Sequence, residues 1–203
     1  IINNAGLLQK NPGGNATISY QVNNSGTFTL SDGVIVLENV LVNAGIIQIP
    51  AGAEISGYYT TLEASSVISG EGTLSLGGAT TLNPGQTLSV ETLNLNGPVN
   101  GTGLFSITHT VNLNGAEIYP PVEVTPSGTL NVFGGSLYSD LTNNGTVNSN
   151  SYLYLNGYVI YNHAAFHLNG DGFLSFGRFD NTGIFDKTSA GTVTLYGYEG
   201  FQN

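Results

Sequence analysis

The sequence predicts an all-β protein that folds as a right-handed parallel β-helix, or β-solenoid, of about ten coils. Two observations favour this fold. An Asn/Ser/Gly-rich corner phrase recurs about every twenty residues, which is the period of one solenoid coil. Directly behind each corner, apolar residues alternate with polar ones, as they do on a strand with one buried face. No window of eleven or more residues has apolar residues at helical spacing, so we expect essentially no helix.

The corner phrase is clearest at Asn23-Asn24-Ser25-Gly26, which is followed by Thr27-Phe28-Thr29-Leu30. Glycine and asparagine tolerate the left-handed backbone conformation that a sharp corner requires. Apolar residues fall at the same offset behind later corners: Asn83-Pro84-Gly85, Gly101-Thr102-Gly103, Pro126-Ser127-Gly128, Asn143-Asn144-Gly145 and Asn181-Thr182-Gly183. Stacked coils would therefore place apolar side chains inside and asparagines above one another at the corners, where their amides can form ladders.

The period-two alternation alone does not distinguish the solenoid from a second fold. An antiparallel β-sandwich also uses short strands with turns every 8–12 residues, roughly, and it remains the alternative fold. The fixed offset between corner and strand favours the parallel stack. Parallel crossover connections are nearly always right-handed, which gives the expected hand of the coil.

The elements follow in order from the first residues. Corners are expected at residues 3–6, 23–26 and 43–45, with strands at 16–20 and 33–42 between them. Because the chain begins inside a repeat, we interpret the sequence as part of a larger product. We treat residues 1–203 as a single β-solenoid domain that contains two irregular loops.

The irregular loops are expected near residues 50–70 and 114–128. The first follows Pro50-Ala51-Gly52, and the second contains Pro120-Pro121, because adjacent prolines cannot lie in a central strand. The alternation is regular between the loops and again in the last third of the chain, which is more aromatic. Strands in that last third are expected at residues 152–155, 166–168, 173–176 and 192–195.

Composition excludes several classes of partner. Charged residues make up only 8% of the chain, and three basic residues stand against 13 acidic ones, for a net charge of −10. Binding to nucleic acid or to an anionic membrane requires clustered cations, so we expect neither partner and no membrane insertion. The chain has no cysteine, which excludes disulfides and thiol chemistry. A surface of uncharged polar residues fits an extracellular or cell-surface protein.

The repeats resemble those of secreted bacterial adhesins. Residues 70–81, Gly-Glu-Gly-Thr-Leu-Ser-Leu-Gly-Gly-Ala-Thr-Thr, together with Gly85-Gln86-Thr87-Leu88, resemble the short strand repeats of autotransporter passenger domains. The Asn-Asn-Gly-Thr corners are similar to those of filamentous-haemagglutinin-like proteins. The resemblance implies a right-handed β-helix, export to the cell surface, and a role in adhesion or surface assembly. The irregular repeats depart from the family pattern.

The acidic residues of the last third were considered as a catalytic group. Glycoside hydrolysis requires carboxylates that converge on one face, and Asp171, Asp180 and Asp186 lie close in sequence to Arg178. Asp171 and Asp180 both lie in turn sequences, so we interpret them as solvated turn residues. We assign no catalytic or cofactor-binding residue and expect the protein not to be an enzyme.

The three histidines, His109, His163 and His167, were considered as metal ligands. His163 and His167 would share a strand face if the strand were unbroken, but no acidic third ligand accompanies them at a fixed spacing. We therefore interpret the histidines as surface or corner residues and assign no metal site.

Tyr152 and Tyr154 are the one candidate ligand-binding pair. They alternate with Leu153 and Leu155, so they should point outward and could stack on sugar rings. The alternative is that they simply cover the β-surface, because tyrosine combines a large apolar ring with a polar tip.

The leading functional expectation is an extracellular structural or adhesive segment that self-assembles into fibres by end-to-end stacking. A bare solenoid end exposes strand edges and apolar core, so the expected partners are further copies or flanking repeats. Glycans and host-surface proteins are the other candidate partners. The alternative functions are a carbohydrate-binding module and a polysaccharide-active β-helix enzyme.

Overall fold

The computed structural model covers all 203 residues and is an all-β solenoid of about 11 turns, without any helix. It divides into two compact units, Ile1–Gly103 (unit 1) and Leu104–Asn203 (unit 2). Every strand pairing within each unit is parallel, which confirms the solenoid and excludes the antiparallel sandwich. No helical segment with the length and apolarity of a membrane span occurs.

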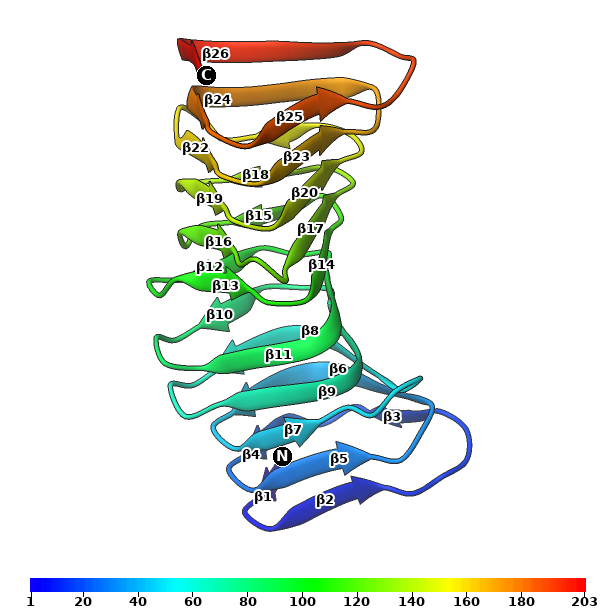
Figure 1. Cartoon of the computed structure of the whole chain (residues 1–203). Helices are drawn as coiled ribbons and strands as arrows, with labels where there is room; N and C mark the ends of the chain where they lie inside the picture. Colours follow the sequence, from blue (N-terminus) through cyan, green and yellow to red (C-terminus); the bar gives the residue numbers. More distant parts are fainter. The chain divides into compact units, whose positions relative to one another are not determined.

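Unit 1 contains three columns of stacked strands (Figure 1). The first column is β1–β4–β6–β8–β10–β12, the second is β2–β5–β7–β9–β11, and the third is β3–β6–β8–β9–β11. The strands are β1 (Ile2–Asn4), β2 (Leu7–Lys10), β3 (Ala16–Ile18), β4 (Val22–Asn24), β5 (Thr27–Leu30), β6 (Val34–Asn43), β7 (Ile46–Gln48), β8 (Glu54–Leu62), β9 (Val67–Leu76), β10 (Thr80–Leu82), β11 (Thr87–Leu95) and β12 (Val99–Gly101).

Unit 2 repeats this arrangement. Its first column is β13–β16–β19–β22–β24–β26, its second is β14–β17–β20–β23–β25, and its third is β15–β18–β21–β24–β26. The strands are β13 (Phe105–Ile107), β14 (Thr110–Leu113), β15 (Ala116–Ile118), β16 (Val122–Val124), β17 (Thr129–Val132), β18 (Gly135–Leu137), β19 (Leu141–Asn143), β20 (Thr146–Ser149), β21 (Leu153–Tyr154), β22 (Val159–Asn162), β23 (Ala165–Leu168), β24 (Gly172–Asn181), β25 (Ile184–Lys187) and β26 (Val193–Gln202).

The coil of unit 1 is right-handed, as expected from its parallel crossovers. In Figure 1 the near strands β5, β7, β9 and β11 run from left to right, and the chain returns along the more distant β6, β8 and β10 while it climbs from the N-terminus. Successive strands of one column are separated by a whole coil, so equivalent side chains of neighbouring coils lie above one another.

The core follows from the period-two alternation. Leu130 and Val132 on β17 are fully buried, whereas Thr129 and Asn131 between them are partly exposed. The same inward positions in neighbouring coils hold Val111 and Val147. Burying apolar area contributes about 25 cal/mol per Å², and this column of inward side chains is the main favourable term for each coil.

Asparagine ladders close one corner in each unit, as the corner phrase predicted. In unit 1 the Nδ2 of Asn4 donates to the Oδ1 of Asn24, and Asn24 in turn donates to Asn43, at 2.7 Å each. In unit 2 the ladder runs in the same direction through Asn143, Asn162, Asn181 and Asn203. These amides are satisfied up the stack, so their burial carries little desolvation penalty.

The prediction of an irregular loop near residues 50–70 is wrong. Pro50 to Gly52 form only a tight turn, in which the N–H of Ala53 donates to the carbonyl of Pro50 at 3.1 Å and Gly52 has a φ of 75°. Most of the rest of the range belongs to β8 and β9, which a second tight turn connects, with the N–H of Ser66 donating to the carbonyl of Glu63 at 2.8 Å. The alternation was obscured because Thr60 occupies an inward position, where it is 2% exposed.

The loop expected near residues 114–128 is also wrong, because β15 and β16 lie within it. Pro120 and Pro121 sit at the corner between these strands, where no N–H is needed for the ladder. Their carbonyls still bond to neighbouring coils. The carbonyl of Pro120 accepts from the Ser139 hydroxyl at 2.6 Å, and that of Pro121 accepts from the N–H of Phe105 at 2.8 Å.

Candidate functional site

The outward orientation predicted for Tyr152 and Tyr154 is confirmed. These side chains are 40% and 39% exposed, whereas Leu153 and Leu155 are fully buried. Both tyrosines contact the ring of Phe173 on β24, one coil further along the chain. The third column of unit 2 therefore presents aromatic side chains on its outer face.

Tyr152 and Tyr154 have different environments. Tyr152 stacks on Phe173 with ring centres 5.7 Å apart and planes 23° from parallel. It also lies over Gly134 of the preceding coil, where an added Cβ would stand 2.8 Å from its ring. Much of the Tyr152 ring is therefore committed to covering this surface, which agrees with the simpler of the two interpretations of the pair.

Tyr154 instead lines a hollow on the outer face of unit 2. Within the third column, Tyr154 pairs in register with Ser175, and Ser175 pairs with Tyr196 on β26. A serine thus separates two tyrosines along the stack. The hollow has a volume of about 360 Å³, and we call it the outer hollow of unit 2; it is lined by Tyr154, Phe173, Ser175, Tyr196, Gly197 and Tyr198.

Phe173 stands between the two tyrosines and fixes the shape of this hollow. Its ring centre lies 5.2 Å from that of Tyr154 at 90°, and 6.1 Å from that of Tyr196 at 76°. Edge-to-face contacts of this kind are favourable because the positive ring edge meets the negative ring face. Ser175, at 2% exposed, lies at the base of the hollow, and Tyr198, at 77% exposed, stands at its rim.

The sequence analysis missed Phe173, Tyr196 and Tyr198. The sequence contained a signal for them, because each outward position recurs once per coil. Phe173 lies one coil after Tyr152, and Tyr196 lies two coils after Tyr154. The alternation within one strand determines the orientation of Tyr152 and Tyr154. The aromatic column depends on the register between coils.

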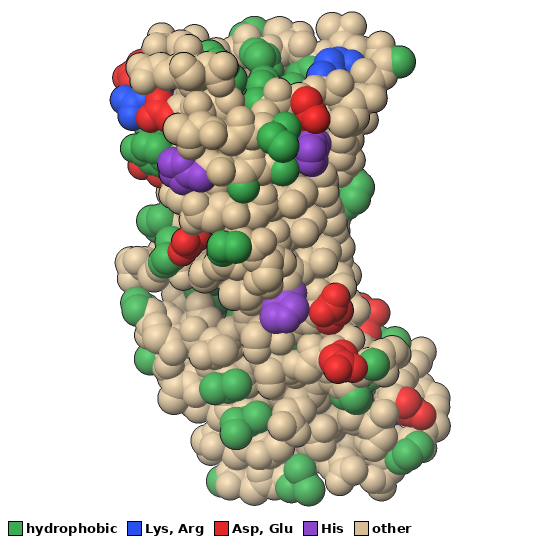
Figure 2. Space-filling model, in the orientation of Figure 1, with side chains coloured by type: hydrophobic (Ala, Val, Ile, Leu, Met, Phe, Trp, Pro, Cys, Tyr) green, Lys and Arg blue, Asp and Glu red, His purple; other side chains and the backbone are tan.

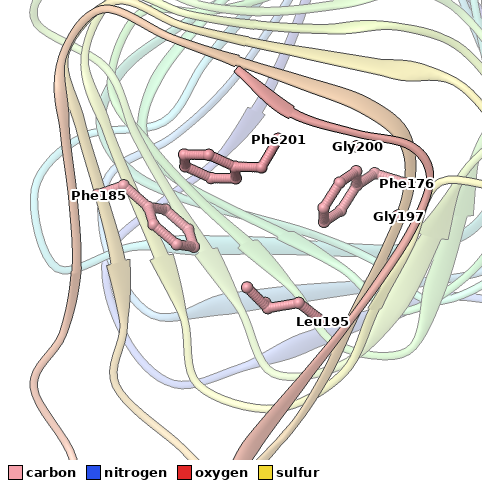
Figure 3. A pocket seen from close by; sticks show the side chains of 6 residues that line it. All are labelled: Phe176, Phe185, Leu195, Gly197, Gly200 and Phe201. Atoms are coloured by element: carbon pink, nitrogen blue, oxygen red, sulfur yellow. The ribbon is translucent and has the colours of Figure 1, made fainter. Parts of the chain in front are cut away.

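A second hollow, the end hollow, opens on the face of the last coil. It has a volume of about 450 Å³ and is lined by Phe176, Phe185, Leu195, Gly197, Gly200 and Phe201. Figure 3 shows the side chains of Phe185, Leu195 and Phe201 pointing into the space that the coil encloses. Phe201 stacks on Phe179 with ring centres 4.8 Å apart, so it continues the column of core phenyl rings.

Two of the candidate carboxylates pair with different basic side chains. Arg178 donates to both carboxylate oxygens of Asp180 at 2.7 and 2.8 Å, and this pairing raises the pKa of the Arg178 guanidinium. Asp186 instead pairs with His167 at 2.6 Å.

The histidines are likewise held apart. Strand β23 begins at Ala165, so His163 lies in the corner before it and does not share an unbroken strand with His167. The Nδ1 of His163 bonds with the hydroxyl of Thr182 at 2.9 Å, and that of His109 with the hydroxyl of Thr108 at 3.0 Å. The structure contains no group of three or more side chains suited to holding a metal ion.

The outer surface is mostly uncharged. On the face in Figure 2, acidic and basic side chains occur singly or in small groups among uncharged polar side chains and backbone.

Comparison with known proteins finds no matching protein family, no matching curated protein and no matching solved structure.

Proposed function

We propose that this chain is an extracellular structural and adhesive segment whose end coils stack on further coils, those of flanking repeats or of other copies, and that copies assemble end to end into fibres. The observation that carries this proposal is the unpaired strand edge of the last coil. Strand β26 pairs with β24 along one edge only, and all of its residues except Val193 are exposed. Unpaired strand edges and an open apolar core are both strong drivers of association between β-coils.

The first coil offers a complementary surface. Strands β1 and β2 pair along one edge only, with β4 and β5. Ile2-Asn3-Asn4 in the first coil and Phe201-Gln202-Asn203 in the last coil occupy equivalent positions at the asparagine corner. A second copy placed head to tail would therefore continue the same column of strands.

The asparagine ladders give this contact a direction. Each Nδ2 donates toward the coil with the higher residue numbers, so Asn181 donates to Asn203 at 2.6 Å. In a stacked pair of copies, the amide of Asn203 would donate to the Oδ1 of Asn4 in the next copy and continue the ladder. A head-to-tail contact between different surfaces produces an open filament unless the rotation between copies closes a ring, and the stacking of coil on coil does not close one.

Composition supports an exterior location and a non-enzymatic role. The chain has three basic residues, no cysteine, and a surface of asparagine, threonine, serine and tyrosine. The separate pairing of Asp180 with Arg178 and of Asp186 with His167 favours structural over catalytic duty for these carboxylates. The resemblance of the corner phrases to secreted adhesins points in the same direction.

Analytical ultracentrifugation and negative-stain electron microscopy across a range of concentrations test the proposal. We expect filaments of increasing length for the unmodified chain. Leu195→Lys, which places an ammonium group in the end hollow, should abolish them because a stacked copy would bury that charge. Tyr58→Lys, at a position 53% exposed within unit 1, is the matched control and should assemble normally. Monomeric particles at the highest concentration reached would contradict the proposal.

A further inference from the structure

The outer hollow of unit 2 has the properties of a small-ligand site. Its volume of about 360 Å³ falls at the lower end of the range for small-molecule pockets, roughly 300–1,000 Å³. Aromatic side chains from β24 and β26 line it together with Tyr154 of β21, and all of these strands are tied into the parallel ladder. Aromatic groups held on a rigid sheet bind a ligand with little loss of side-chain freedom.

The aromatic rings of the hollow form one apolar surface. Tyr154 and Tyr196 lie two steps apart along the ladder, and the ring of Phe173 lies between them, with its centre 5.2 Å and 6.1 Å from theirs. Tyr154 and Tyr196 are 39% and 57% exposed. A saturated ring can therefore pack on the open faces of these side chains, at a van der Waals distance of about 4 Å.

The polar groups at the hollow are all neutral. They are the phenol hydroxyls of Tyr154, Tyr196 and Tyr198 and the hydroxyl of Ser175, each able to donate and to accept. No charged side chain lines the hollow, and Arg178, one of the two cationic side chains of unit 2, is occupied by Asp180. With a net charge of −10, the chain disfavours anionic ligands.

We propose that the outer hollow of unit 2 binds one ring of an uncharged saccharide. The C–H faces of a sugar ring pack on the tyrosine rings, while its hydroxyls bond to the phenol hydroxyls at the rim. The site comprises Tyr154, Phe173, Ser175, Tyr196 and Tyr198, and Tyr152 contributes only by supporting Phe173. The inference adds a ligand class to the adhesive role and does not require fibre formation, because every residue that lines the hollow belongs to one copy.

Two-dimensional NMR and tyrosine fluorescence titrations with cellohexaose, mannohexaose and chitohexaose test this site. The absence of tryptophan leaves the tyrosine signal unobscured. We expect at least one of these neutral oligomers to bind in the micromolar-to-millimolar range. Tyr154→Ala and Tyr196→Ala should each weaken binding at least tenfold, whereas Tyr154→Phe should retain the stacking and lose less. Tyr58→Ala and Tyr59→Ala in unit 1 are the matched controls and should leave the affinity unchanged.

Several results would overturn the proposal. They are the absence of binding to all three oligomers, binding that survives the Tyr154→Ala/Tyr196→Ala double variant, and equal or tighter binding of the anionic polymer polygalacturonate. Loss of binding in Tyr152→Ala but not in Tyr196→Ala would also overturn it, because the ligand would then occupy a different surface. Circular dichroism identifies any variant that fails to fold, and Tyr154→Phe keeps the test valid in that case. Sedimentation of the same samples reports assembly separately.

Discussion

The two units carry outer hollows of nearly equal size, each on the third column of its own unit, yet the linings of the hollows differ. The outer hollow of unit 1 has a volume of about 350 Å³, against about 360 Å³ in unit 2. In unit 1 it is lined by Val36, Leu37, Glu38, Ser56, Gly57, Tyr58 and Gly77. A single tyrosine and a carboxylate thus stand where unit 2 has four aromatic side chains.

The difference arises from the outward positions of the third column. In unit 1, Ser56 pairs with Val36 on one side and Ser75 on the other. In unit 2, the equivalent serine lies between two tyrosines. The backbone ladder is the same in both units, so the shape of a hollow comes from the coil and its chemistry comes from the residues displayed.

The cores of the two units also differ in their aromatic content. Phe28 is the one phenylalanine of unit 1 and packs among aliphatic side chains, whereas unit 2 concentrates phenyl rings in its last coils. Phe179 lies within 6 Å of four other rings, those of Phe166, Phe176, Phe185 and Phe201, with centres 4.8–5.6 Å away. The aromatic character of unit 2 therefore extends from the core to the outer face.

The largest expected effect concerns this aromatic core. Phe179→Ala should lower the free energy of unfolding by about 3–5 kcal/mol, because it removes a fully buried ring. The comparison of Phe179→Leu with Phe28→Leu is sharper. The Phe179 variant should be the more destabilising, by about 0.5–1.5 kcal/mol for each ring contact that it loses. Urea unfolding measures both, and equal losses would show that the ring contacts add nothing beyond burial.

The asparagine ladder should matter equally in both units. Asn162→Ala removes donors to Asn181 and to the carbonyl of Ile184, so we expect a loss of about 1–3 kcal/mol. Asn43→Ala in unit 1 should cost a similar amount. The exposed Asn11→Ala is the control, with an expected change within about 0.5 kcal/mol. A ladder variant as mild as the control would contradict the role assigned to these corners.

A smaller effect is expected when the aromatic column is transplanted. Val36→Tyr combined with Ser75→Tyr places a tyrosine on each side of Ser56, which reproduces the Tyr–Ser–Tyr order of unit 2. In a chain that also carries Tyr154→Ala and Tyr196→Ala, we expect weak binding of the same neutral oligomer, with NMR shifts confined to this hollow. The affinity should remain below that of unit 2, because unit 1 has no counterpart of Phe173. Binding without any shift near Ser56 would contradict the transplant.

The smallest expected effect concerns an exposed carboxylate of unit 1. The backbone N–H of Gly13, together with Lys10, holds the pKa of Asp32 below its usual value. A depressed folded pKa means that Asp32 stabilises the fold above its unfolded pKa and loses that contribution as the pH falls through the folded value. Asp32→Asn should therefore remove an acid-dependent rise in amide exchange at Gly13. An unchanged pH profile in the variant would refute this assignment.

Much of the fold follows from the sequence, because a coil needs only a corner and an alternating strand. The Asn-x-Gly corners and the apolar pairs behind them predicted the parallel stack and the amide ladders. The two expected loops were wrong for a physical reason. A buried threonine at Thr60 and prolines at Pro120 and Pro121 depart from the pattern of a strand, but in a solenoid they fill an inward position and a corner.

The sequence predicted only part of the candidate site. The alternation with Leu153 and Leu155 predicted that Tyr152 and Tyr154 face outward. It could not separate their roles, which depend on Gly134 and Phe173 in neighbouring coils. Partners from adjacent coils become apparent only once the coil register is known, since each coil varies in length.

The most direct measurement is an NMR titration of the whole chain, labelled at the ring carbons of its 11 tyrosines, with the neutral oligosaccharide that binds best. The proposal predicts saturable shifts for Tyr154, Tyr196 and Tyr198, with Tyr58 and Tyr59 unmoved throughout. Shifts at the unit 1 tyrosines of equal size, or none at Tyr154 and Tyr196 at saturating oligosaccharide, would contradict it.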